Sequence, residues 1–136
     1  MTTVQRVATI SGAIFVLVSL AGFTPVGMGV MQMDANGSAS LLGMFPVNAL
    51  HNAVHLLFGI WGVWAGRTAA RSVAYALGSG AAYLLLGVVG LFTTSLFGII
   101  PIGGYDVYLH LVLAVALAGC GFWAMWFAPQ REPVVA

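Results

Sequence analysis

Four apolar stretches, each close to the length of a membrane span, limit what this chain can fold into. They lie near residues 7–23, 47–65, 72–92 and 106–127. A helix needs about 20 mostly apolar residues to cross roughly 30 Å of hydrocarbon. Only 5% of the 136 residues are charged, whereas a soluble domain carries about a quarter. The sequence therefore predicts an all-α integral membrane protein, an antiparallel four-helix bundle in a single domain.

The basic residues of the chain predict its orientation. All of them are arginines near the ends of the predicted spans: Arg6, Arg67, Arg71 and Arg131. With four spans they fall on one side of the membrane, which the positive-inside rule makes cytoplasmic. Both termini are then cytoplasmic, and the loops 24–45 and 93–105 lie outside. We expect a multi-pass protein of the bacterial cytoplasmic (inner) membrane, with the first span retained although Ser19–Ala21 resembles a signal-peptide cleavage site.

The charge of the chain also limits its partners. A formal net charge of +1 gives no basic surface for nucleic acid. The expected partner is the lipid bilayer, and a homo-oligomer or a larger membrane complex remains open. Enzyme motifs are absent, since the chain has no lysine for a phosphate-binding loop and no G-x-S-x-G sequence. Catalysis is therefore not indicated.

Two of the three histidines stand one helical turn apart in the second span. His51 and His55 occupy the outer half of that helix, and His110 lies one turn into the fourth span from its outer end. On a helical projection these side chains share faces with small and polar residues, so we expect them to point into the bundle. Asp106 lies on the same face as His110. The pattern predicts that imidazoles from two spans meet near the outer membrane face.

Such a cluster has the composition of a metal site. Histidines at i and i+4 bind one ion from a single helical face, and His110 offers a third nitrogen. Asp106 either ligates directly or accepts a hydrogen bond from a ligating histidine. Copper and zinc suit these ligands, and haem with two axial histidines is the less favoured cofactor because small residues bring the helices close. The residues expected around the ligands are Asn48, Asn52, Tyr83 and Thr94.

The first outer loop adds a separate feature. Met28, Met31 and Met33 lie close together in the sequence, and thioethers are soft ligands that favour Cu(I). A copper-capturing loop is one interpretation. The other is an interfacial lid in which methionines fill irregular gaps.

A structural role is the alternative to metal binding. Asn, Asp and His near helix ends cap backbone groups and bond to neighbouring helices. On this interpretation the polar residues only lock the helices together, and the protein is a non-enzymatic structural or accessory subunit of a membrane complex.

Two motifs also carry a family resemblance. The segment "NALHNAVHLLFGIWG", read as N-x-x-H-N-x-x-H, and the segment "YDVYLHLVLA", read as D-x-x-L-H, resemble an uncharacterised family of small bacterial four-helix membrane proteins, a domain of unknown function. The resemblance implies the four-span fold and supplies no activity. The residues that match its motifs are Asn48, His51, Asn52, His55, Asp106 and His110.

Overall fold

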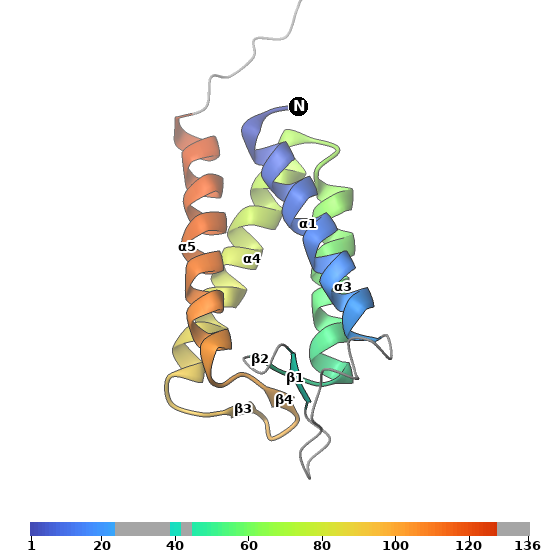
Figure 1. Ribbon diagram of the computed structural model, residues 1–136. Coiled ribbons are helices and arrows are strands. Elements are labelled where there is room, and N and C mark those ends of the chain that lie inside the picture. The colour runs from blue at the N-terminus through green and yellow to red at the C-terminus, as the bar shows by residue number, and fades with distance from the viewer. Residues whose placement is uncertain (24–38, 42–44, 128–136) are drawn as a thin grey trace, which may run out of the picture.

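Four long helices lie side by side in the computed structural model, which describes residues 1–23, 39–41 and 45–127 (Figure 1). Within this part of the chain they are α1 (Thr3–Gly22), α3 (Ala49–Ala65), α4 (Ala69–Gly90) and α5 (Tyr105–Trp126). Helices α1, α4 and α5 are each long and apolar enough to cross a membrane. Helix α3 has 17 residues, or about 26 Å. The predicted all-α membrane bundle is confirmed.

The bundle has two ends of different construction. One holds the start of α1, the end of α5 and residues 66–68, which connect α3 to α4 (Figure 1); we call it the link end. The other, the hairpin end, holds the end of α1, the start of α3 and residues 91–104, which connect α4 to α5. Successive helices therefore run in opposite directions.

Two short β-hairpins close the hairpin end. Strand β1 (Ala39–Leu41) pairs antiparallel with β2 (Phe45–Val47), with Ala39 opposite Val47. Strand β3 (Ser95–Leu96) pairs with β4 (Ile100–Pro101), with Leu96 opposite Ile100. The sequence interpretation treated both regions as loops, because strands of two or three residues are too short to show a period of two.

Three of the helices begin directly after a residue whose side chain caps them, and not where the apolar run begins. In α1 the Thr2 hydroxyl accepts from the backbone N–H of Gln5, and the Gln5 side chain accepts from that of Thr2, which forms a capping box. The helix thus begins at Thr3, before the apolar run. The Asn48 side chain caps α3 by accepting from the His51 N–H at 2.8 Å, and Thr68 caps α4.

Glycines allow the helices to pack as two tight pairs, α1 with α3 and α4 with α5. A Cβ on Gly12 of α1 would lie 2.5 Å from the backbone nitrogen of Val63 in α3. A Cβ on Gly80 of α4 would lie 2.7 Å from the backbone nitrogen of Ala118 in α5. Since real Cβ atoms do not approach so closely, these contacts require glycine. Close backbone contact supplies the packing that lipid cannot drive.

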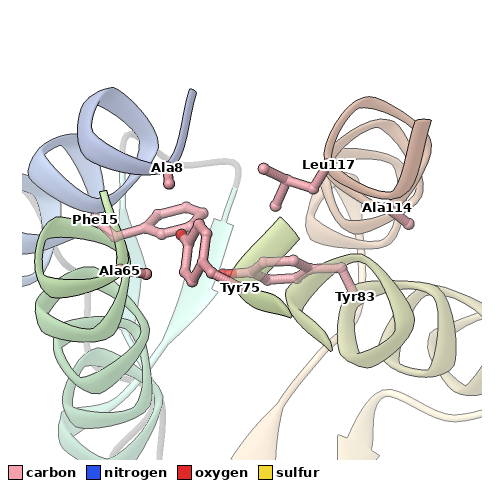
Figure 2. Packing of buried hydrophobic residues seen from close by; sticks show 7 residues of the cluster. All are labelled: Ala8, Phe15, Ala65, Tyr75, Tyr83, Ala114 and Leu117. Carbon is pink, nitrogen blue, oxygen red and sulfur yellow. The ribbon is translucent and has the colours of Figure 1, made fainter. Parts of the chain in front are cut away.

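Larger side chains fill the space between the two pairs. The aromatic rings of Phe15, Tyr75 and Tyr83 project into it, and Ala8, Ala65, Ala114 and Leu117 complete the cluster (Figure 2). Phe15 lies 5.6 Å from Tyr83 between ring centroids. Because these aromatic rings keep the two helix pairs apart, the same space can hold imidazole rings nearer the hairpin end.

Candidate metal centre

Three imidazoles from two helices converge at the hairpin end of the bundle. One ring nitrogen each from His51, His55 and His110 lies within 4.8 Å of the other two. The ring centroids of His51 and His55 are 4.6 Å apart, and each lies 6.3 Å from that of His110. His51 is 4% and His110 1% exposed. The inward faces expected from the sequence thus meet across the space between the helix pairs.

Backbone carbonyls fix the tautomers of the two α3 histidines. Nδ1 of His51 lies 3.0 Å from the carbonyl oxygen of Pro101, and Nδ1 of His55 lies 3.1 Å from that of His51. A carbonyl oxygen only accepts, so each Nδ1 carries the proton and donates it. Nε2 of both rings then keeps a lone pair. This is the arrangement in which metal-binding histidines are commonly held.

His110 and Asp106 supply buried polar atoms whose hydrogen-bonding capacity is unused. Within the described residues, neither ring nitrogen of His110 nor Oδ2 of Asp106 has a hydrogen-bond partner. Oδ2 lies 3.6 Å from Nδ1 of His110 and 4.0 Å from Nε2 of His51. A buried polar group without a partner costs about 1–3 kcal/mol. The carboxylate and the imidazoles are therefore assembled around one point without satisfying one another.

The spacing of the nitrogens suits a single ion after a small contraction. Tetrahedral zinc, with Zn–N distances of about 2.0–2.1 Å, places its ligand nitrogens about 3.3 Å apart. The observed limit of 4.8 Å is wider by about 1.5 Å, which small side-chain rotations can close. A haem would need a flat space beside the imidazoles, but Phe15 lies 5.6 Å from His55 and Tyr83 lies 5.3 Å from His110 between ring centroids. The donor set fits a single ion better than a macrocycle.

The residues expected around the ligands occupy four different environments. Asn48 caps α3 and donates from Nδ2 to the carbonyl of Ile99 at 2.6 Å. Asn52 is buried against Gly22 of α1. Tyr83 stacks on His110. Thr94 is exposed and contributes only its carbonyl, which accepts from the Ile102 N–H at 3.1 Å, so the structure does not bring its side chain to the histidines.

Two further points complete the comparison with the sequence. The predicted soft-metal residues Met28, Met31 and Met33 lie outside the described residues. The carbonyl of Pro101, which orients His51, was missed by sequence reasoning. Every residue carries a carbonyl, so no residue type could have indicated it.

The fold and the site define the class: an all-α membrane protein with a buried histidine cluster between its helices. A family model described as "Domain of unknown function (DUF4383)" matches residues 5–123. The chain therefore belongs to this uncharacterised family, in agreement with the resemblance noted from its motifs. Neither a curated protein nor a solved structure matches the chain.

Proposed function

We propose that this protein binds one transition-metal ion at the hairpin end of its bundle. The ligands are Nε2 of His51, Nε2 of His55 and a ring nitrogen of His110. The observation that carries the proposal is that one ring nitrogen of each histidine lies within 4.8 Å of the other two, while the rings of His51 and His55 are held by carbonyls at Nδ1. Imidazole ligands suit zinc and copper.

Asp106 completes the site by its charge. Three neutral imidazoles leave a divalent ion with its full charge, which is costly to bury among apolar helices. A carboxylate oxygen 3.6 Å from His110 lowers that cost, either as a fourth ligand or by accepting the Nδ1 proton of a ligating His110. Replacement of Asp106 by Asn is expected to weaken metal binding about 10- to 100-fold, as loss of such partners does elsewhere.

The structural alternative explains less of the cluster. If the polar residues only locked the helices together, their buried atoms would be paired with one another or with the backbone. His51 does bond to Pro101, yet His110 and Asp106 Oδ2 have no hydrogen-bond partner among the described residues. A bound cation would satisfy these atoms. The metal site therefore accounts for more of the observed geometry than the structural alternative does.

We place the site toward the outside of a bacterial cytoplasmic membrane. Arg6, Arg67 and Arg71 lie in or beside the link end, and the positive-inside rule puts that end in the cytoplasm. The hairpin end, with the histidines, then faces outward. Antibody or cysteine labelling of the α3–α4 link and of the β3–β4 hairpin in intact cells tests this orientation.

Metal analysis of the detergent-purified protein tests the site itself. After chelation and reloading with Zn²⁺ or Cu²⁺, the wild type is expected to retain one ion per chain. A His51→Ala and His110→Ala double variant is expected to retain none, with its helical circular dichroism unchanged. Tyr105→Phe is the matched control, since Tyr105 is 63% exposed beside Asp106.

Each other outcome of this experiment has a definite meaning. A wild type that retains no more metal than the double variant contradicts the proposal and leaves the structural subunit. A Soret absorption band in the purified protein would replace the single ion with haem.

A further inference from the structure

The connection between α4 and α5 is apolar and exposed at the hairpin end of the bundle. Residues 91–104 contain no charged side chain. Phe92 and Phe97 are 85% and 86% exposed, and Leu91 and Ile99 are exposed as well. Exposed apolar surface of this kind marks a place where a protein meets a partner or a membrane. The question is therefore what covers this connection.

Phe97 occupies a turn position that does not favour it. The β3–β4 hairpin turns between Leu96 and Ile99, whose N–H donates to the carbonyl of Leu96 at 3.1 Å. The two central residues, Phe97 and Gly98, have φ values of 53° and 74°. Asn-Gly is a preferred pair where both φ angles are positive, and a bulky side chain is uncommon there. The turn geometry alone does not account for a phenylalanine.

The backbone of the hairpin is hydrogen-bonded to the protein, as an apolar environment requires. The carbonyls of Ile99 and Pro101 accept from side chains at the start of α3. The backbone carbonyl and N–H of Ser95 both bond to the hydroxyl of Thr93, at 3.0 and 3.3 Å. A backbone group can leave water without a large cost only when protein atoms satisfy it. These groups of the hairpin meet that condition.

The length of α3 indicates the depth of the hairpin tip. This helix has 17 residues, or about 26 Å, whereas the hydrocarbon core is roughly 30 Å thick. Asn48 at its start donates to the carbonyl of Ile99 at 2.6 Å, and the hairpin extends from the α4–α5 pair toward this helix start (Figure 1). With the link end at one membrane surface, Ile99 and the nearby Phe97 lie close to the opposite edge of the hydrocarbon.

The exposed apolar face of α4 continues into the same connection. Leu84 and Val88 are exposed on this helix, and Leu91 follows them at helical spacing. Leu91 also keeps helical dihedral angles, with φ −69° and ψ −23°, and Phe92 comes directly after it. The surface that α4 presents to lipid therefore reaches the first residues of the connection.

We propose that the tip of the β3–β4 hairpin, with Phe97 at its end, is inserted into the interfacial layer of the bilayer. The partner is lipid, and the ring of Phe97 contacts acyl chains next to the headgroups. A second protein is the alternative occupant, but the depth of the tip and its continuity with the exposed face of α4 favour lipid. This contact is additional to metal binding and does not depend on it.

Spin-label accessibility in liposomes tests the depth of the tip. Cys120→Ala removes the single cysteine of the full chain, and a nitroxide is attached at Phe97→Cys in phosphatidylcholine liposomes. Leu85→Cys and Arg67→Cys are the reference positions, exposed in the α4 span and in the link. The rate of collision with O₂, divided by that with a water-soluble nickel chelate, is expected to be severalfold higher at residue 97 than at residue 67, and lower than at residue 85.

Two results overturn the proposal. Equal collision ratios at residues 97 and 67 would show that the tip projects into water. A label at residue 97 that neither reagent reaches would show that protein covers the tip, and dilution with unlabelled chain would then identify a second copy if access returned. Ile99→Cys repeats the measurement in case the label at residue 97 disturbs the turn.

Phe97→Asn separates lipid contact from turn formation. Asn suits the positive φ better, so a hairpin held by its turn alone would show slower amide hydrogen exchange in this variant. A hairpin anchored in lipid loses its ring contact, and exchange over residues 95–101 is expected to become severalfold faster in phospholipid nanodiscs. Phe127→Asn, which changes a 75% exposed ring at the link end, is the matched control and should leave that exchange unchanged. Slower or unchanged exchange in Phe97→Asn contradicts the proposal.

Discussion

The two ends of the bundle differ in how fully their polar side chains are hydrogen-bonded. At the link end these side chains bond to backbone carbonyls: Gln5 Nε2 donates to Gly66, and Ser72 Oγ donates to Ala65 and Thr68. At the hairpin end Asn48 and His51 also bond to carbonyls, but both nitrogens of His110 and one oxygen of Asp106 have no hydrogen-bond partner among the described residues. The comparison separates two kinds of polar group in one bundle. Side chains that only join helices already have their hydrogen-bond partners, whereas His110 and Asp106 keep atoms that a ligand could bind.

The ends also differ in what fills the space between the two helix pairs. A Cβ on Gly62 would lie 2.8 Å from Cζ of Tyr75 and 2.9 Å from the carbonyl oxygen of Ala8, so the side of the bundle toward the link is closed by contact with backbone. Toward the hairpins the corresponding space holds imidazole rings. Within each pair the close contacts continue to the hairpin end, where a Cβ on Gly87 of α4 would lie 2.6 Å from Cδ2 of Leu111 in α5.

The largest expected effect comes from disruption of the close contact. Gly62→Leu places a branched side chain where even a Cβ has no room, so α1 and α4 must move away from α3. Overpacking of this kind costs about 1–3 kcal/mol or more, and we expect loss of folded protein. Size-exclusion chromatography in detergent measures it. Gly119→Leu is the control, because a Cβ there meets nothing within 4 Å, and equal loss in both variants would contradict this account.

Metal removal is expected to affect only the hairpin end. An ion at 100 times its dissociation constant stabilises the folded state by about 2.7 kcal/mol. Chelation should therefore lower the melting temperature of the wild type and leave that of the His51→Ala and His110→Ala double variant unchanged. Thermal unfolding followed by circular dichroism measures both. An equal response in the two proteins would contradict a specific site.

Loss of Asn48 is expected to have an intermediate effect. Its side chain caps α3 and also donates to Ile99, so Asn48→Ala removes a cap worth about 0.5–2 kcal/mol. The melting temperature should fall, and hydrogen exchange should rise in residues 95–101. Asn48→Asp, which keeps the accepting oxygen, is expected to preserve the cap and lose only the bond to Ile99. Equal exchange in these two variants would show that the cap does not act separately.

The smallest effects are expected to have opposite signs at the two ends. Ser72→Ala removes the hydroxyl whose one hydrogen is shared between the carbonyls of Ala65 and Thr68 and should destabilise the protein by about 1 kcal/mol. His110→Leu removes two buried nitrogens that have no hydrogen-bond partner among the described residues, with only Asp106 Oδ2 at 3.6 Å from one of them, and should stabilise the metal-free protein. Melting temperatures of metal-free samples compare the two. A lower melting temperature of His110→Leu would mean that His110 stabilises the helix packing in the metal-free protein.

Periodicity predicted which side chains face inward, and that was enough to bring the histidines together. In an apolar chain the few polar residues of a helix turn away from lipid, so the projections of His51, His55 and His110 fixed their direction. The Asn48 cap was equally predictable from its residue type. These predictions depend on local geometry alone.

The remaining parts of the site depend on where elements end and how loops turn. Thr94 fell on the inward stripe only if the third span continued past residue 92, whereas α4 ends at Gly90 and Thr94 is exposed. The carbonyl of Pro101 reaches His51 through a hairpin whose turn contains Phe97 and Gly98, at φ values of 53° and 74°. Such turn geometry has no periodic signal in the sequence.

The attachment of the β3–β4 hairpin has a kinetic consequence. Asn48 and His51 hold this hairpin through the carbonyls of Ile99 and Pro101, and Pro101 and Ile102 are buried beside the cluster. We expect a metal ion that enters or leaves on this side to wait until these two bonds break. The residence time of the ion then depends on the rate at which the β3–β4 hairpin opens. Slow exchange is expected even for an ion that binds weakly.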